Sequence, residues 1–146
     1  MTTRRVEILH GVNLDQLGRR DPALYGALTL AQLEARITTF ATELGLEATC
    51  FQTNAEHVYV ERLHAARGTV DGLILNPGAW THYAWAIRDA LEIAGVPAVE
   101  VHLSNVQERE AFRRTSVVRD LCVATVSGEG PDGYRTALEH LSEALA

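Results

Sequence analysis

The sequence has 146 residues, of which 47% are hydrophobic and 22% charged, the size and composition of one soluble globular domain. Its formal net charge of -6 argues against a general nucleic-acid or anionic-membrane binder, although a local basic pocket for a small anion stays open. No apolar stretch is long enough to span a bilayer and no apolar signal segment opens the chain, so we expect a cytoplasmic protein without a membrane partner.

Strand-like and helix-like segments alternate along the chain. Short apolar runs predict strands, and apolar residues at helical spacing, ended by glycine, predict helices. In chain order the predicted elements are strand Arg5–Leu9, helix Thr29–Leu44, strand Glu47–Gln52, helix Glu56–Arg67, strand Val70–Leu75, helix Thr81–Ala94, strand Ala98–His102, a short helix Gln107–Phe112, strand Leu121–Ser127 and helix Pro131–Ala146.

This alternation predicts an α/β fold, namely a flavodoxin-like, doubly wound parallel sheet of five strands with helices on both faces. The third strand, Val70–Leu75, is almost wholly apolar, which is typical of a strand buried on both sides. No internal repeat or linker divides the chain, so we expect one domain over residues 1–146. Ligands of such sheets bind at the carboxyl ends of the strands.

A long polar loop, His10–Ala27, follows the first strand. It contains "GRRDPALYG", Gly18–Gly26, whose glycines and proline predict irregular structure rather than a core element. The loop is too long for a simple connection, which makes residues of about 18–27 a candidate lid. Its arginines and Tyr25 are either a functional group or a solvated surface, and spacing alone does not choose between Arg19 and Arg20.

Polar residues collect just beyond the first, third and fourth predicted strands. Asn13 follows the first strand, Asn76 and His82 follow the third, and Glu100 and His102 end the fourth. Residues two apart on a strand face the same side, so Glu100 can contact His102. Each feature has a plain structural alternative, such as a turn or a structural ion pair. Their convergence on one sheet edge favours a functional site.

These residue types permit general acid–base chemistry on a small polar, anionic substrate. A tyrosine is a weak base until nearby positive charge stabilises its phenolate, and arginines supply such charge without losing their own protons. His102, oriented by Glu100, can donate a proton to a leaving oxygen. Asn13 and backbone N–H groups can stabilise an enolate oxygen.

The cysteines and the basic residues narrow the chemistry further. Cys50 and Cys122 have no metal-ligand spacing and fall in apolar, strand-like runs, so we expect buried reduced thiols and no metal site. All 13 basic residues are arginines, which excludes an imine on a lysine side chain and a P-loop lysine.

Four segments in order, "GVNLDQLGRRDPALYG", "LILNPGAWTHYAWAIRDAL", "VEVHLSNVQEREAFR" and "SGEGPDGY", resemble type II 3-dehydroquinate dehydratase from about Val6 to Leu141. The resemblance implies a flavodoxin-like lyase without cofactor or metal, assembled as a dodecamer of four trimers. It implies dehydration of 3-dehydroquinate to 3-dehydroshikimate by anti elimination through an enolate, in the shikimate pathway or in quinate breakdown. The absence of lysine agrees, because the unrelated type I enzyme requires one.

The resemblance also implies a role for each site residue. Tyr25 matches the base, Arg20 the lid arginine that activates it, Asn13 the residue that holds the enolate-stabilising water, His102 the general acid and Glu100 its orienting carboxylate. Substrate contacts are implied for Asn76, His82, Leu103, Ser104 and Arg113. Arg109 matches an arginine near the site, and Asp89 a residue that reaches the site of a neighbouring trimer subunit.

The chain departs from the family pattern at several positions. His10-Gly11-Val12-Asn13-Leu14 replaces the usual N-G-P-N-L, and the lost proline is expected to loosen the turn before Asn13. Other departures are the bulky Tyr83 and Trp85, Gln107-Glu108 in place of His-Ala, and Thr115 in place of His.

These departures leave open a catalytically weak paralogue that binds a quinate-like acid as a sensor or assembly subunit. A flavin or signalling module fits less well. The chain lacks the Ser/Thr-rich phosphate loop of a flavodoxin, and it lacks the acidic pair and lysine of a response receiver.

Overall fold

The computed structural model describes residues 2–146, so Met1, the first residue of the predicted domain, lies outside the described residues. Five parallel strands form one sheet in the order β2-β1-β3-β4-β5. Their bounds are β1 Arg4–His10, β2 Leu46–Gln52, β3 Gly72–Asn76, β4 Ala98–His102 and β5 Ala124–Ser127. The predicted α/β class, strand number and parallel direction are confirmed, and the order is that of flavodoxin-like sheets.

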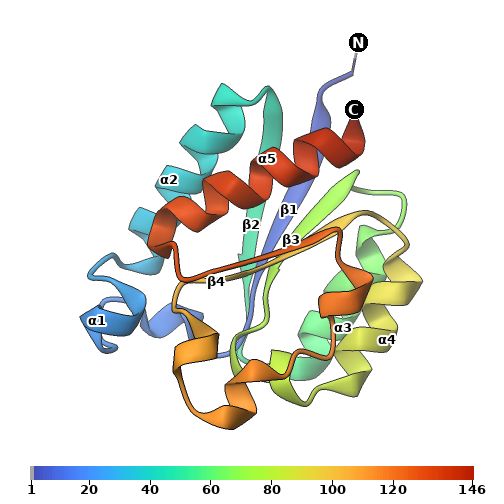
Figure 1. Cartoon of the computed structure of the whole chain (residues 1–146). Helices are drawn as coiled ribbons and strands as arrows, with labels where there is room; N and C mark the ends of the chain where they lie inside the picture. Colours follow the sequence, from blue (N-terminus) through green and yellow to red (C-terminus); the bar gives the residue numbers. More distant parts are fainter. Residues whose placement is uncertain (1) are drawn as a thin grey trace.

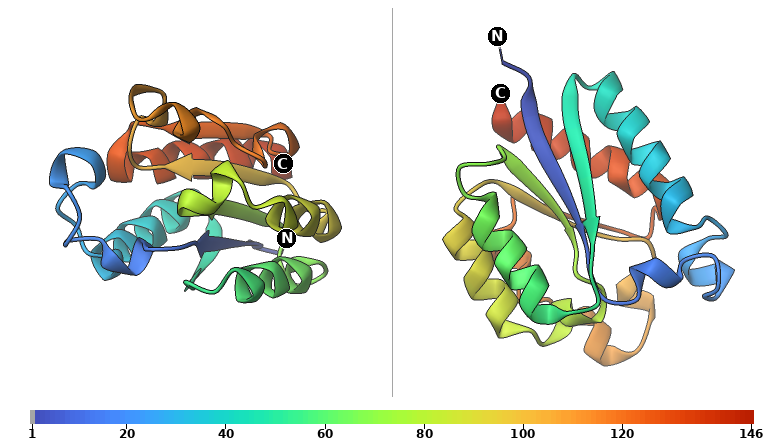
Figure 2. Two further views of the ribbon diagram at one scale, coloured as in Figure 1. Left: turned by 90° about the horizontal axis from the view of Figure 1, so that it is seen from below. Right: turned by 180° about the vertical axis from the view of Figure 1, so that it is seen from behind.

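Helices cover both faces of the sheet (Figures 1 and 2). Helices α2 (Leu30–Glu43) and α5 (Gly133–Leu145) pack on one face, and α3 (Glu56–Ala66) and α4 (Trp85–Ala94) on the other. Successive strand residues point to opposite faces, so Ile8 joins the first core and Leu9 the second.

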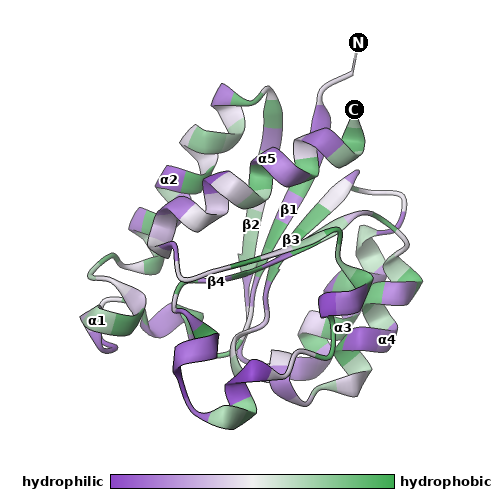
Figure 3. Ribbon diagram, in the orientation of Figure 1, coloured by the Kyte–Doolittle hydropathy of each residue, from purple (hydrophilic) through white to green (hydrophobic). Residues whose placement is uncertain are grey.

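The central strand is apolar because both of its faces are covered. Every residue of β3 is buried, as the predicted apolar run requires. Gly72 also allows α5 to approach closely, since a Cβ there would lie 2.9 Å from Leu141 Cδ1. The surrounding helices carry alternating polar and apolar bands (Figure 3), the pattern of helices with one face on a core. Over residues 2–146, none of the helices combines the length and apolarity that a membrane crossing requires.

The carboxyl ends of β1, β2 and β3 lie opposite the end of the molecule that carries the two termini (Figure 1). The connections after β1 and β4 extend from this end, and the first of them includes α1 (Pro22–Tyr25). These loops are therefore placed where a parallel sheet binds its ligands.

The sequence predicted irregular structure throughout Gly18–Gly26, and this prediction is wrong in part. Residues Pro22–Tyr25 form the helical turn α1, because Pro22 occupies its first position and Asp21 caps it by accepting the Ala23 N–H at 2.9 Å. Leu14 and Leu17 anchor the preceding part of the connection in the core.

Two predicted helices differ in their first turn. The helix predicted from Thr81 begins at Trp85, because Gly78–His82 form a separate 3-10 turn and Tyr83 leaves helical geometry. The helix predicted from Pro131 begins at Gly133, after another 3-10 turn.

Two further corrections concern the chain between β4 and β5. Two 3-10 turns, Val106–Glu108 and Ala111–Arg114, stand where the sequence predicted a short helix over Gln107–Phe112. Backbone hydrogen bonds here join each N–H to the carbonyl three residues earlier, as in a 3-10 helix. Strand β5 begins at Ala124 rather than Leu121, because Arg119–Leu121 also form a 3-10 turn. Cys122 therefore lies before the strand and not in it.

Candidate active site

A cavity of about 130 Å³ opens at the carboxyl ends of the strands. Its lining comes from the connections after β1, β3 and β4, the three segments that the sequence predicted to converge. Ten of the predicted site residues line it: Asn13, Arg20, Tyr25, Asn76, His82, His102, Leu103, Ser104, Arg109 and Arg113. Glu100 lies behind His102, and Asp89 is exposed on α4.

The connections after β1 and β3 fit together at two glycines. A Cβ on Gly11 would lie 2.3 Å from the Pro77 carbonyl oxygen, and a Cβ on Gly78 would lie 2.6 Å from that of Val12. Gly11 also donates its N–H to the Asn76 carbonyl at 2.7 Å. Only residues without a side chain permit this close approach.

Asn13 is fixed at the pocket by its backbone. It is the sole non-glycine with positive φ among residues 2–146, at 69°, a conformation that asparagine tolerates. Its N–H donates to Asn54 Oδ1 at 2.8 Å, and Asn54 is held in turn by Asp15. Among residues 2–146, no group forms a hydrogen bond with the Asn13 side chain, so this side chain is free to bind a ligand.

Two arginines donate to the hydroxyl oxygen of Tyr25. Arg20 Nη2 lies 2.7 Å from this oxygen and Arg109 Nη1 lies 2.6 Å from it. The Arg20 guanidinium also covers the ring, 3.8 Å from its centroid. Tyr25 is half-buried and packs against the first core, so its hydroxyl is held between two positive charges.

Glu100 holds His102 through a short contact of 2.6 Å between Oε2 and Nε2. Thr81 donates to Oε2 at 2.5 Å and Ser116 to Oε1 at 2.8 Å. Burial alone would raise the pKa of the Glu100 carboxyl, but the hydrogen bonds from His102, Thr81 and Ser116 outweigh it and lower the pKa. Glu100 is therefore a carboxylate that accepts the His102 Nε2–H, which leaves Nδ1 for a ligand.

His82 is held by the chain that precedes β5. Its Nδ1 donates to the Thr115 carbonyl at 2.7 Å, because a carbonyl can only accept. The pKa of His82 is lowered, chiefly by burial and further by His102 and Arg113, against the effect of the Thr115 hydrogen bond. A neutral ring that donates from Nδ1 presents Nε2 to the pocket as an acceptor.

Asn76 and Arg113 complete the lining. The Asn76 side chain donates to the buried Tyr134 hydroxyl at 3.2 Å and accepts the Gly78 N–H at 3.2 Å, which fixes its amide plane. Arg113 forms an ion pair with Glu110. Asp89 lies outside this lining, so the chain does not bring it to its own pocket.

Sequence reasoning missed several of these contacts. It identified Arg109 only as an arginine near the site, whereas the structure places its guanidinium on Tyr25, 84 residues away in the chain. It also missed Thr81 and Ser116, which bind the Glu100 carboxylate. Thr81 lies in the predicted post-strand segment and offered a weak signal. Ser116 offered none, because nothing local links it to β4.

Among residues 2–146, one group has ligand atoms spaced to hold a metal ion: His10, Glu34 and Cys50. None of the three lines the pocket. Both cysteines are free thiols, partly buried rather than fully buried, and burial raises the pKa of each to about 12.

Comparisons with known proteins agree with this fold. A family model described as dehydroquinase class II matches residues 4–142. The 3-dehydroquinate dehydratase of Desulforudis audaxviator is 46% identical over 142 residues, 97% of this chain and 95% of the relative. That of Pelobacter propionicus is 48% identical over 143 residues, 97% and 96% of the two chains.

The solved structures give the same answer. The type II dehydroquinase from Propionibacterium acnes superimposes with a TM-score of 0.92 at 39% identity, covering 97% of this chain and 98% of that one. A 3-dehydroquinate dehydratase-like protein from Bifidobacterium longum has a TM-score of 0.72 at 28% identity, covering 98% of each chain. Because the family model matches residues 4–142 and the relatives and the fold agree, the chain belongs to the class II dehydroquinase family.

Proposed function

We propose that this chain dehydrates 3-dehydroquinate to 3-dehydroshikimate and water. The observation that carries the proposal is the Tyr25 hydroxyl, which receives hydrogen bonds from two arginines at the pocket that His102 also lines. A base and an acid on one small cavity are what an elimination beside a ketone requires. The names and high identity of the relatives support the same substrate.

In this proposal Tyr25 removes the proton beside the ketone. The guanidinium charges of Arg20 and Arg109 favour the phenolate, and both arginines stay protonated throughout. The electron pair left by the proton moves to the ketone oxygen and forms an enolate. Asn13 supports this oxygen through a bound water, because its side chain amide faces the pocket without a partner in the described chain.

His102 then protonates the leaving hydroxyl. The Glu100 carboxylate holds its Nε2 and stabilises the positive charge of the protonated ring, so the proton is delivered from Nδ1. The enolate collapses to a conjugated double bond as water leaves. The base and the acid act on opposite faces of the ring, which gives anti elimination.

The remaining lining residues bind the substrate. Arg113 and the Leu103–Ser104 segment suit its carboxylate, while Asn76 and the neutral His82 suit its ring hydroxyls. We also propose that residues of about 18–27 act as a lid, which brings Arg20 over the pocket. This lid belongs to a single domain over residues 1–146.

We further propose that the chain assembles as a dodecamer of four trimers, in which Asp89 reaches the site of a neighbouring subunit. Asp89 is exposed on α4, and Trp85 on the same helix is 65% exposed, as a residue at a subunit contact would be in one chain alone. Sedimentation analysis tests this assembly, and a stable monomer or dimer would contradict it.

The decisive experiment supplies 3-dehydroquinate to the purified protein and follows the ultraviolet absorbance of the conjugated product. Tyr25→Phe should lose most of kcat with little change in substrate binding, because it removes only the hydroxyl that transfers the proton. A near-normal rate would contradict the assignment of the base. Saturable binding without turnover by the unmodified protein would instead favour the catalytically weak paralogue.

A further inference from the structure

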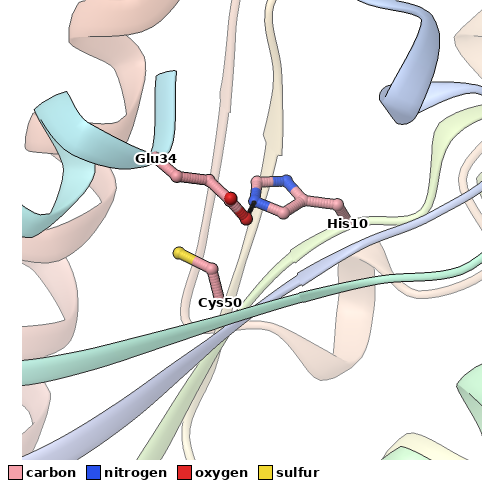
Figure 4. Close-up of side chains that lie close together, drawn as sticks. All are labelled: His10, Glu34 and Cys50. Carbon is pink, nitrogen blue, oxygen red and sulfur yellow. Dashed lines mark ion pairs between the residues drawn. The ribbon is translucent and has the colours of Figure 1, made fainter. Parts of the chain in front are cut away.

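A second cluster of polar side chains lies on the sheet face covered by α2, outside the active-site pocket. His10 ends β1, Cys50 lies on the neighbouring strand β2, and Glu34 projects from α2 toward both (Figure 4). His10 Nε2 is 3.3 Å from Glu34 Oε2, and ligand atoms of all three residues lie within 4.8 Å of one another.

His10 is the unusual member of this cluster. Its side chain is fully buried, and neither ring nitrogen has a hydrogen-bond partner in the part of the chain that the structure describes. The contact with Glu34 has the distance of an ion pair without the alignment of a hydrogen bond. Buried polar atoms are nearly always satisfied, so an aimed and unpartnered imidazole is evidence for a ligand.

The three donor types are those of a zinc site. Imidazole nitrogen, thiolate sulfur and carboxylate oxygen all bind Zn²⁺, whereas Mg²⁺ and Ca²⁺ select oxygen ligands alone. Bonds of about 2.0–2.1 Å in a tetrahedron place neighbouring nitrogen and oxygen ligands about 3.3 Å apart. The His10–Glu34 separation has this length, which is longer than a good hydrogen bond.

We propose that His10, Glu34 and Cys50 bind one Zn²⁺ per chain, with water as the fourth ligand. Glu34 is 32% exposed and gives the ion a path from solvent. On binding, the bond between sulfur and hydrogen in Cys50 is replaced by one between sulfur and zinc, and the proton leaves to solvent.

Such a site would be structural. It would join β1, β2 and α2 behind the loop that carries Asn13, and its three ligands lie outside the cavity lining. The proposal is independent of the proposed reaction, because its test uses no substrate.

The test starts from chelator-treated protein, titrated with Zn²⁺ against a chromophoric chelator. We expect one tight equivalent per chain, and at least about tenfold weaker binding in His10→Asn and Cys50→Ser. Cys122→Ser is the matched control, since Cys122 is also a free, partly buried thiol with a pKa raised to about 12. No tight equivalent, or equal loss in the Cys122 control, would overturn the proposal.

Co²⁺ supplies a second readout, which reports directly whether a thiolate is among the ligands. Thiolate-bound Co²⁺ gives an intense charge-transfer absorption that nitrogen and oxygen ligands do not give. This band should appear with the unmodified protein and with Cys122→Ser and be absent with Cys50→Ser. A Co²⁺ complex without the band in the unmodified protein would show that the cluster is only an ion pair beside a neutral thiol.

Discussion

Replacing Arg109 by methionine tests whether Tyr25 is activated from two sides. Methionine keeps much of the apolar stem and removes the guanidinium that donates to the Tyr25 oxygen at 2.6 Å. A hydrogen bond to a charged group contributes about 1.5–3 kcal/mol, so its loss from the phenolate state should lower kcat about 10- to 150-fold. The substrate is bound before the proton moves, so KM should change much less than kcat.

The assay is the initial rate of product absorbance over a range of substrate concentrations. Arg20→Met should lower kcat by a similar factor, because Arg20 donates to the same oxygen at 2.7 Å. Arg19→Met is the matched control: Arg19 is exposed, and between residues 2 and 146 no hydrogen bond joins it to Tyr25. If Arg109→Met matches the Arg19 control while Arg20→Met loses activity, then the reasoning from the Arg109 contact is wrong.

Two further predictions concern the groups behind the pocket. The pKa of Glu100 lies below its ordinary value of 4.5, so its ionised form adds stability that is present above about pH 4.5 and lost as pH falls through the lowered pKa. Chemical denaturation should therefore show a smaller loss of unfolding free energy on acidification in Glu100→Gln than in the unmodified protein, and equal pH slopes would contradict this. Gly11→Ala places a Cβ 2.3 Å from the Pro77 oxygen and should cost about 1–3 kcal/mol, lowering Tm by roughly 2–12 °C in thermal unfolding. Gly133→Ala, whose Cβ would meet nothing closer than 3.4 Å, should change Tm less, and similar values for the two variants would count against the close-packing argument.

The fold could be predicted from sequence because its signals are local. The apolar run of β3 predicts a buried strand, and the glycines that follow α2, α3 and α4 predict where these helices end, to within a few residues. The Glu100–His102 contact follows from the two-residue period of a strand, and it is confirmed at 2.6 Å. Convergence of Asn13, Asn76 and His102 follows from the rule that parallel strands end at one edge.

The missed features depend on contacts between distant parts of the chain. Arg109 meets Tyr25, and Ser116 meets Glu100, through loops whose paths no local pattern encodes. The helix predicted from Thr81 was too long because apolar spacing continues through the 3-10 turn, while Thr81 itself is drawn toward the Glu100 carboxylate. Pattern alone cannot weigh such a tertiary contact against helical propensity.

The interlocked glycines also matter to anyone who wishes to redesign this pocket. Because Gly11 contacts Pro77 and Gly78 contacts Val12, neither loop has an independent backbone path. A library that randomises the Asn13 segment while holding the Asn76–His82 segment constant would mostly produce variants in which the two loops no longer pack against each other. Folded variants should be obtained more often when both segments are exchanged together and come from the same parent sequence.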